Sequence, residues 1–119
     1  MSAAKWILPT GIAVPVVRAQ VTLPRALQDP TSGQYRPHIV IGPQSQREAI
    51  RNGNVLTEDY LGVSFVGGPG LMKPGESAEV SLALIYSPQV DYSKVKPGAT
   101  FTVREGAAIK GFGVILSDD

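Results

Sequence analysis

In this chain of 119 residues, prolines and glycines separate one short apolar run from the next. Its thirteen glycines and ten prolines are spread along the chain, not gathered in one low-complexity block. Two phrases, "MKPGES" (72–77) and "VKPGAT" (95–100), each place proline and glycine at adjacent turn positions directly before an apolar stretch. This spacing of proline and glycine between apolar runs predicts many short strands joined by tight turns, with almost no helix.

Period-two alternation is clearest from residue 16 onward, and it predicts a strand with one buried and one solvated face. The apolar set there is Val17, Ala19, Val21 and Leu23. Further strands are predicted at 35–42, 59–67, 78–86, 100–104 and 107–116. The third strand carries Leu61, Val63 and Phe65 on one face, and the closing hairpin offers Phe101, Val103, Ile109 and Val114 as core candidates.

Residues 43–54, "PQSQREAIRNGN", have helical character. Ser45 can cap a short turn and Gly53 can end it, so we predict one or two helical turns there. The complete prediction is an all-β protein: a small closed antiparallel Greek-key barrel of about six strands over 16–119. An irregular N-terminal arm, 1–15, precedes it. Trp6 in that arm either packs across its own barrel, which we favour, or anchors a partner.

The composition of the chain argues against several classes of function. The net charge of +1 gives no general electrostatic case for nucleic acid or an anionic membrane, and no apolar run approaches a membrane span. The absence of cysteine excludes disulfides, thiolate catalysis and Cys-ligated metals. Pro9 and Pro15 interrupt the only stretch resembling a secretory leader, so a cytoplasmic protein is expected.

Three ordered stretches carry a resemblance to a known family: "YRPHIVIG", "LMKPGESAEVSLALI" and "FTVREGAAIKGFGVIL". They resemble the C-terminal β-barrel domain, the third domain, of elongation factor Tu and related translational GTPases, over approximately residues 17–116. The matching positions are Tyr35, Arg36, Pro37, Met72, Pro74, Gly75, Glu76, Phe101, Val103, Arg104, Glu105, Gly106, Gly111, Gly113 and Val114.

The resemblance implies a stand-alone barrel without the family's GTPase domain. No G-x-x-x-x-G-K-[ST] loop occurs, so no nucleotide is expected. In the family, one side of this barrel contacts the T-stem backbone of aminoacyl-tRNA, and its final hairpin contributes residues that match Glu105 and Gly106. Where the family has a Gln after Tyr-Arg-Pro, this chain has His38.

The "REG" stretch, 104–106, has two interpretations. Gly106 can supply the positive φ of a tight hairpin turn, with Arg104 and Glu105 solvated or paired across strands. Alternatively, Arg104 and the backbone N–H of Gly106 receive a phosphate. For "GFG" (111–113), a sharp bend or close backbone packing is favoured over a dinucleotide fingerprint.

The function predicted is a non-enzymatic interaction module that binds a protein partner or itself through the barrel face. The alternatives are tRNA binding and, less favoured, a small enzyme; no cofactor or metal is expected, and His38 is the only histidine. Arg47 and Arg51 would stand one helical turn apart as a basic patch. The candidate contact residues are Arg36, His38, Arg47, Arg51, Arg104, Glu105 and Gly106.

Overall fold

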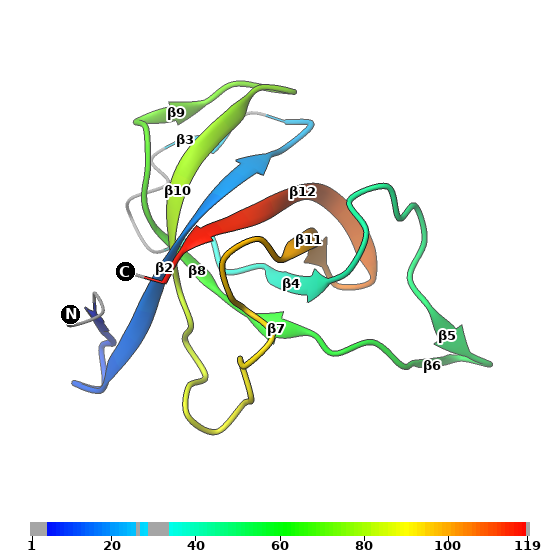
Figure 1. Ribbon diagram of the computed structural model, residues 1–119, viewed down its shortest axis with the longest axis horizontal. Coiled ribbons are helices and arrows are strands. Elements are labelled where there is room, and N and C mark those ends of the chain that lie inside the picture. Colours follow the sequence, from blue (N-terminus) through cyan, green and yellow to red (C-terminus); the bar gives the residue numbers. More distant parts are fainter. Residues whose placement is uncertain (1–4, 26, 29–33, 119) are drawn as a thin grey trace.

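The computed structural model describes residues 5–25, 27, 28 and 34–118, and every regular element among them is a β-strand (Figure 1). Residues 28–34, "QDPTSGQ", whose composition is typical of a loop, lie largely outside the described residues, as do the start of the arm and the last residue. The strands are β1 (Lys5–Ile7), β2 (Ala13–Thr22), β3 (Leu27–Gln28), β4 (His38–Ile41), β5 (Arg51–Asn52), β6 (Val55–Leu56), β7 (Leu61–Gly62), β8 (Ser64–Gly67), β9 (Leu71–Met72), β10 (Ser77–Ala83), β11 (Thr100–Glu105) and β12 (Ala108–Ser117).

The main sheet is antiparallel throughout and curls around one core (Figure 1). Its strand order is β7-β4-β11-β12-β2-β10-β8, with β1 paired to the start of β2. The pairs β3-β9 and β5-β6 form two small accessory sheets. The all-β prediction and its antiparallel character are confirmed.

The prediction of a closed barrel is wrong in detail, because the strand ladder is an open path that curls into a half-barrel. Its two end strands, β7 and β8, follow one another in the chain with only Val63 between them. The ladder to β4 stops at this residue, and the ladder to β10 begins after it. The chain itself therefore joins the two ends of the path.

Both Pro-Gly phrases form the predicted turns. The N–H of Glu76 donates to the carbonyl of Lys73, and the N–H of Ala99 donates to that of Lys96. The glycines, at φ 75° and 88°, occupy the left-handed position of type II turns. Each turn delivers the chain directly into a long strand, β10 or β11.

The core lies inside the curl of the sheet. The predicted alternation of β2 is confirmed, and Leu61, Val63 and Phe65 are all buried. Of the hairpin candidates, Phe101 and Val103 are fully buried, but Ile109 and Val114 are only half-buried, and Ile115 takes the core position on β12. Ile109 pairs with Arg104 and Val114 pairs with Thr100, so both lie on the outer face, and the bulge at Lys110 is what places these two residues on the same face.

The predicted helical turn at 43–54 is wrong. This segment makes a tight turn in which the N–H of Gln46 donates to the carbonyl of Pro43, and it then enters the β5-β6 hairpin with Gly53 and Asn54 at its tip. Gly-Asn is good chemistry for a two-residue hairpin turn, and this local preference prevails over the weak helical pattern. The hairpin extends away from the main sheet (Figure 1).

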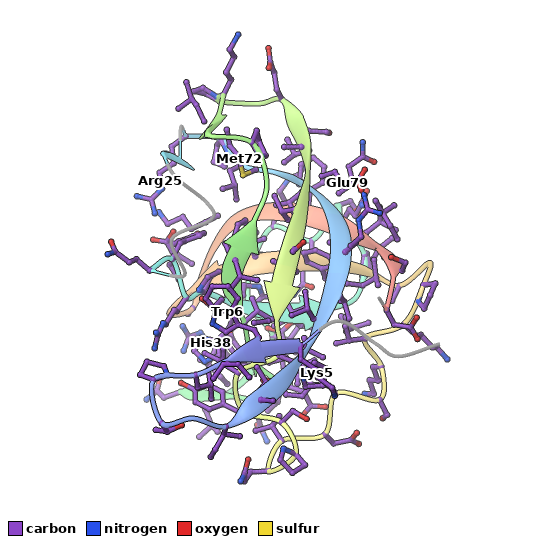
Figure 2. The ribbon with its side chains drawn as sticks, turned by 90° about the vertical axis from the view of Figure 1, so that its left-hand side faces the viewer. Lys5, Trp6, Arg25, His38, Met72 and Glu79 are labelled. Atoms are coloured by element: carbon purple, nitrogen blue, oxygen red, sulfur yellow. The ribbon has the colours of Figure 1, made fainter. Side chains whose placement is uncertain are left out.

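The N-terminal arm is more regular than predicted. Lys5–Ile7 pairs with Ala13–Pro15 of β2 as a hairpin that crosses one end of the sheet (Figure 2). Trp6 packs on a small second cluster of buried residues that includes Val14 and Ile85. The aromatic ring thus covers the protein's own surface, as the favoured interpretation expected.

Candidate functional site

Arg104 is the largest fully buried side chain among the described residues, with no exposed surface. It belongs to β11, where Phe101 and Val103 face the core. Because side chains alternate along a strand, Thr102 and Arg104 point to the outer face of the sheet. A charged residue on an outer face is normally solvated, so something must cover it.

The cover is residues 43–60, which we call the cover segment. Its Glu58 carboxylate receives two hydrogen bonds of 2.9 Å from the two terminal guanidinium nitrogens of Arg104. The Tyr60 hydroxyl lies 2.9 Å from the same guanidinium, and the arginine Nε donates to Thr102 Oγ1 at 2.9 Å. All donors of this buried cation that face inward therefore meet acceptors, as a buried charge requires.

Glu58 is held ionised by the same contacts. The Arg104 guanidinium, the Gln46 side-chain amide and the N–H of Ile50 all donate to the Glu58 carboxylate, and they outweigh its burial, so its pKa falls to about 2. Gln44 adds a further link from the cover segment to the sheet, since its Nε2 donates to the Gly113 carbonyl at 2.9 Å. The cluster thus pins the cover segment to β11 and β12.

A surface hollow of about 420 Å³ lies beside the turn between β11 and β12; we call it the hairpin hollow. Five of the seven predicted contact residues line it. Its lining is Arg25, Tyr35, Arg36, Pro37, His38, Arg104, Glu105 and Gly106. The 35–38 and 104–106 stretches therefore meet at one place in the structure.

The Glu105 carboxylate already binds two side chains of the hairpin hollow. The Tyr35 hydroxyl donates to its carboxylate at 2.7 Å, and Arg25 forms an ion pair with the same oxygen. Burial alone would raise the pKa of Glu105, but these two partners outweigh it and hold that pKa below its usual value. Gly106 turns the chain at φ 59° and is exposed, so the structural interpretation of this glycine is confirmed.

The remaining predicted residues are separated. Arg51 lies on the projecting β5-β6 hairpin, and Arg47 lies on the cover segment facing β12. His38 is half-buried, with its ring 6.0 Å from the ring of Tyr60 in an edge-on arrangement. Within the described residues, no group of three or more His, Cys, Asp or Glu side chains is placed to hold a metal.

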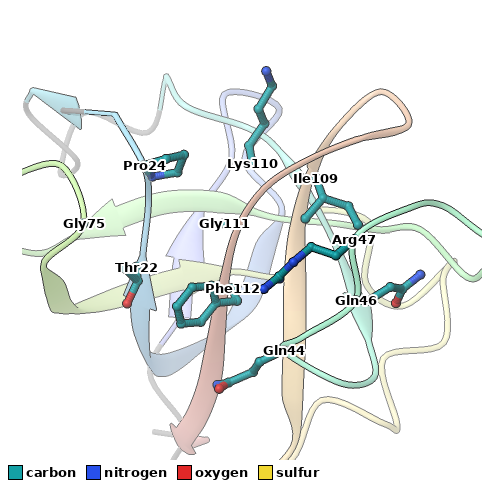
Figure 3. Close-up of a pocket in the computed structure, with 10 residues that line it drawn as sticks. All are labelled: Thr22, Pro24, Gln44, Gln46, Arg47, Gly75, Ile109, Lys110, Gly111 and Phe112. Atoms are coloured by element: carbon teal, nitrogen blue, oxygen red, sulfur yellow. The ribbon is translucent and has the colours of Figure 1, made fainter.

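A second hollow, also about 420 Å³, lies between the cover segment and the outer face of β12 (Figure 3). We call it the Phe112 groove. Phe112 is 40% exposed at its floor. The groove is lined by Thr22, Pro24, Gln44, Gln46, Arg47, Gly75, Ile109, Lys110, Gly111 and Phe112.

The "GFG" motif explains why Phe112 faces outward. A Cβ on Gly113 would lie 2.5 Å from the Gln20 carbonyl oxygen and 2.5 Å from the Phe101 ring, and one on Gly111 would lie 2.5 Å from the Thr22 carbonyl oxygen. The inward positions on either side of Phe112 thus admit only glycine. Close backbone packing is confirmed as the role of both glycines.

The bulge at Lys110 completes the groove. In a regular strand Ile109 and Lys110 would point to opposite faces, but the extra residue redirects this part of β12, and all four residues from Ile109 to Phe112 line the groove. Arg47 reaches across it toward Phe112 (Figure 3). The result is an apolar floor with two cations beside it.

Sequence reasoning missed Glu58, Tyr60 and Phe112 as site residues. Glu58 and Arg104 lie 46 positions apart, and no local pattern connects them. For Phe112 a signal did exist: alternating glycines on a strand mark a close-packed inner face, and the aromatic residue between them must then face outward.

Comparisons with known proteins give no family for the chain: no family model matches it, and no curated protein matches it. Among the described residues, no helix has the length and apolar character needed to span a membrane.

Proposed function

We propose that this chain is a non-enzymatic, cytoplasmic interaction module that binds a protein partner, or a second copy of itself, through the Phe112 groove. One observation carries the proposal: a large aromatic side chain stands 40% exposed in an apolar hollow, on a strand whose neighbouring positions hold it outward. Exposed aromatic anchors in hollows are the typical centres of protein interfaces.

The resemblance to the third domain of elongation factor Tu is part of this proposal. Curled antiparallel topology and the two Pro-Gly turns support it. In that family the barrel packs against a GTPase domain, so a protein-binding face is consistent with the resemblance. A fold of this type hosts many functions, so the groove, not the fold, supports the function.

Site-specific photo-crosslinking tests the proposal. A benzophenone amino acid is placed at position 112 and, as a matched control, at position 116, because Leu116 is 43% exposed on the same strand but does not line the groove. We expect an adduct from native lysate, or a dimer of the purified chain, only with the probe at position 112. Equal labelling at both positions, with a strictly monomeric chain in light scattering, would refute the proposal.

RNA binding is the second candidate function, because the hairpin hollow gathers Arg25, Arg36 and His38 at one surface. Its support is weaker, since Arg104 is buried against Glu58 and cannot offer its guanidinium to a phosphate. Filter binding of tRNA at low salt decides the matter. The candidate requires binding that weakens with salt and with Arg36→Ala but not with Arg51→Ala.

A further inference from the structure

The Phe112 groove carries positive charge without a matching negative group. Arg47 and Lys110 both line it, and no aspartate or glutamate does. Within the described residues, the salt bridges involve other cations, namely Arg18, Arg25, Lys94 and Arg104. Lys110 lies close enough to Glu105, which is outside the groove lining, to help lower the pKa of that carboxylate. Neither groove cation forms an ion pair among these bridges, so both can still pair with a carboxylate of a ligand.

The rest of the groove wall is short of ligand-binding polar groups. Ile109, Phe112 and Pro24 supply apolar surface, and Gly111 and Gly75 add bare backbone. Among the amides, Gln44 Nε2 is directed to the Gly113 carbonyl and Gln46 Nε2 to Glu58. An occupant must then combine apolar surface for the floor with negative charge for the two cations.

Resting on the proposed function, we propose that the Phe112 groove binds an acidic protein segment: a short stretch in which an apolar or aromatic side chain is flanked by aspartate or glutamate. The apolar side chain packs on Phe112 and Ile109, and the carboxylate pairs with Arg47 or Lys110. A charge-assisted contact next to a desolvated aromatic anchor supplies both affinity and register.

A nucleic acid fits this groove less well. Binding of a single strand uses a positively charged channel that tracks several phosphates, together with several stacking platforms. Here two cations stand beside one aromatic ring, and the chain as a whole has a net charge of only +1. Oligonucleotide binding is nevertheless included as an outcome in the experiment.

The experiment selects random twelve-residue peptides displayed on phage against the full chain, after depletion on Phe112→Ala. Synthetic versions of the enriched peptides are then titrated by fluorescence anisotropy, beside oligo-uridylate. We expect enriched sequences that combine acidic and aromatic or branched apolar residues. Phe112→Ala should weaken binding by at least about thirtyfold, and Arg47→Gln or Lys110→Gln by about tenfold each.

Charge exchange makes the test specific. Arg47→Glu should lose the acidic peptide and gain the same peptide with its acidic residue replaced by lysine. Arg51→Gln and Leu116→Ala are the matched controls, since both are exposed but lie outside the groove, and they should change affinity less than twofold. Circular dichroism and the unfolding midpoint verify that every variant remains folded.

Each outcome bears on a different claim. Peptides that need Phe112 but ignore Arg47 and Lys110, or that are basic, would overturn the acidic segment while leaving the proposed function intact. Recovery of no Phe112-dependent peptide would also overturn the acidic segment, whereas the proposed function is decided separately by the crosslinking from position 112. Tighter binding of oligo-uridylate than of any peptide, lost in Arg47→Gln, would replace the protein segment by a nucleic acid.

Discussion

Strands β11 and β12 lie side by side, and each places an unusual residue on the outer face of the sheet. On β11 a cation, Arg104, is fully buried; on β12 an aromatic residue, Phe112, is 40% exposed. The cover segment accounts for the difference. Its Glu58 and Tyr60 side chains cover Arg104. Beside β12 the segment reaches only the edge of the Phe112 groove, which Arg47 lines.

The comparison shows that chemical type alone does not decide burial on an outer face. Arg104 is buried because a distant part of the same chain brings a carboxylate and a hydroxyl to it. Phe112 has no such cover from the described residues, and we propose that a partner provides it. Arg104 is covered within the chain, whereas the cover of Phe112 by a partner is our proposal.

The largest effect is expected from breaking the buried pair. Glu58→Gln keeps the shape of the side chain but leaves the Arg104 charge without its counterion, so the free energy of unfolding should fall by about 3–5 kcal/mol. Urea denaturation measures this loss. As a matched control, Glu79→Gln in the exposed Arg18–Glu79 pair should cost less than about 1 kcal/mol.

The double variant Glu58→Leu with Arg104→Met tests further whether the buried Arg104 charge depends on the Glu58 counterion. Because it removes both charges together, it should recover most of the stability lost in Glu58→Gln. If Glu58→Gln costs no more than the exposed control, or if the double variant is less stable than the single one, the account of Arg104 as a counterion-dependent buried charge is wrong.

A pH series tests the same pair without changing the wild-type chain. The pKa of Glu58 is about 2 in the folded protein and is near 4.5 without these contacts. A lowered folded-state pKa means that the stabilisation is present above pH 4.5 and is lost as pH falls toward 2. The stability difference between wild type and Glu58→Gln should therefore shrink steadily below pH 4.5, by on the order of 2–3 kcal/mol by pH 2.

Other carboxylates also contribute to the pH dependence of stability at acidic pH, so their contribution must be subtracted. Subtracting the Glu58→Gln curve does so, because Glu105 and the remaining acids are common to both proteins. A difference that stays constant from pH 6 to pH 2.5 would show that Glu58 is not stabilised by its ionised form.

The glycines beneath Phe112 come next in size. Gly113→Ala places a Cβ against the Gln20 carbonyl and the Phe101 ring, so β12 must shift, at a cost of about 1–3 kcal/mol. Gly70→Ala is the control, since nothing lies within 4 Å of its Cβ position and a small effect is expected. Thermal unfolding measures both; equal destabilisation would contradict the close-packing role of Gly113.

Local patterns predicted much of this fold because local forces set those parts of it. The alternation of β2 and the Pro-Gly turns depend on neighbouring residues only, and both formed as expected. Ile109 and Val114 were predicted in the core, but they pair with Arg104 and Thr100 on the outer face, and one extra residue, Lys110, places both on that face. A bulge has no strong local signature, so it is visible only once the partner strand is known.

Of the candidate site, too, one part could be predicted from the sequence and another part could not. The 35–38 and 104–106 stretches, which both supplied candidate contact residues, meet at the hairpin hollow. Arg104 was expected to be solvated, to pair across strands or to bind a phosphate, yet it is buried against Glu58, which lies in a segment predicted to follow a short helical turn. Long-range electrostatic pairing of this kind depends on the tertiary path of the cover segment, which composition and periodicity do not encode.

The smallest stability effect should come from Phe112, and this contrast with Arg104 is the sharpest test of the comparison. Because Phe112 is 40% exposed and the partner side of the groove is open, Phe112→Ala removes only part of the area that a core aromatic residue buries and should lower the free energy of unfolding by about 1–2 kcal/mol. Leu116→Ala, on the same strand and 43% exposed, should behave alike in urea denaturation. The two variants should then differ only in binding. A loss of more than about 3 kcal/mol for Phe112→Ala alone, as for a core aromatic residue, would make Phe112 a structural residue, completed from within like Arg104, and would leave the groove without its anchor.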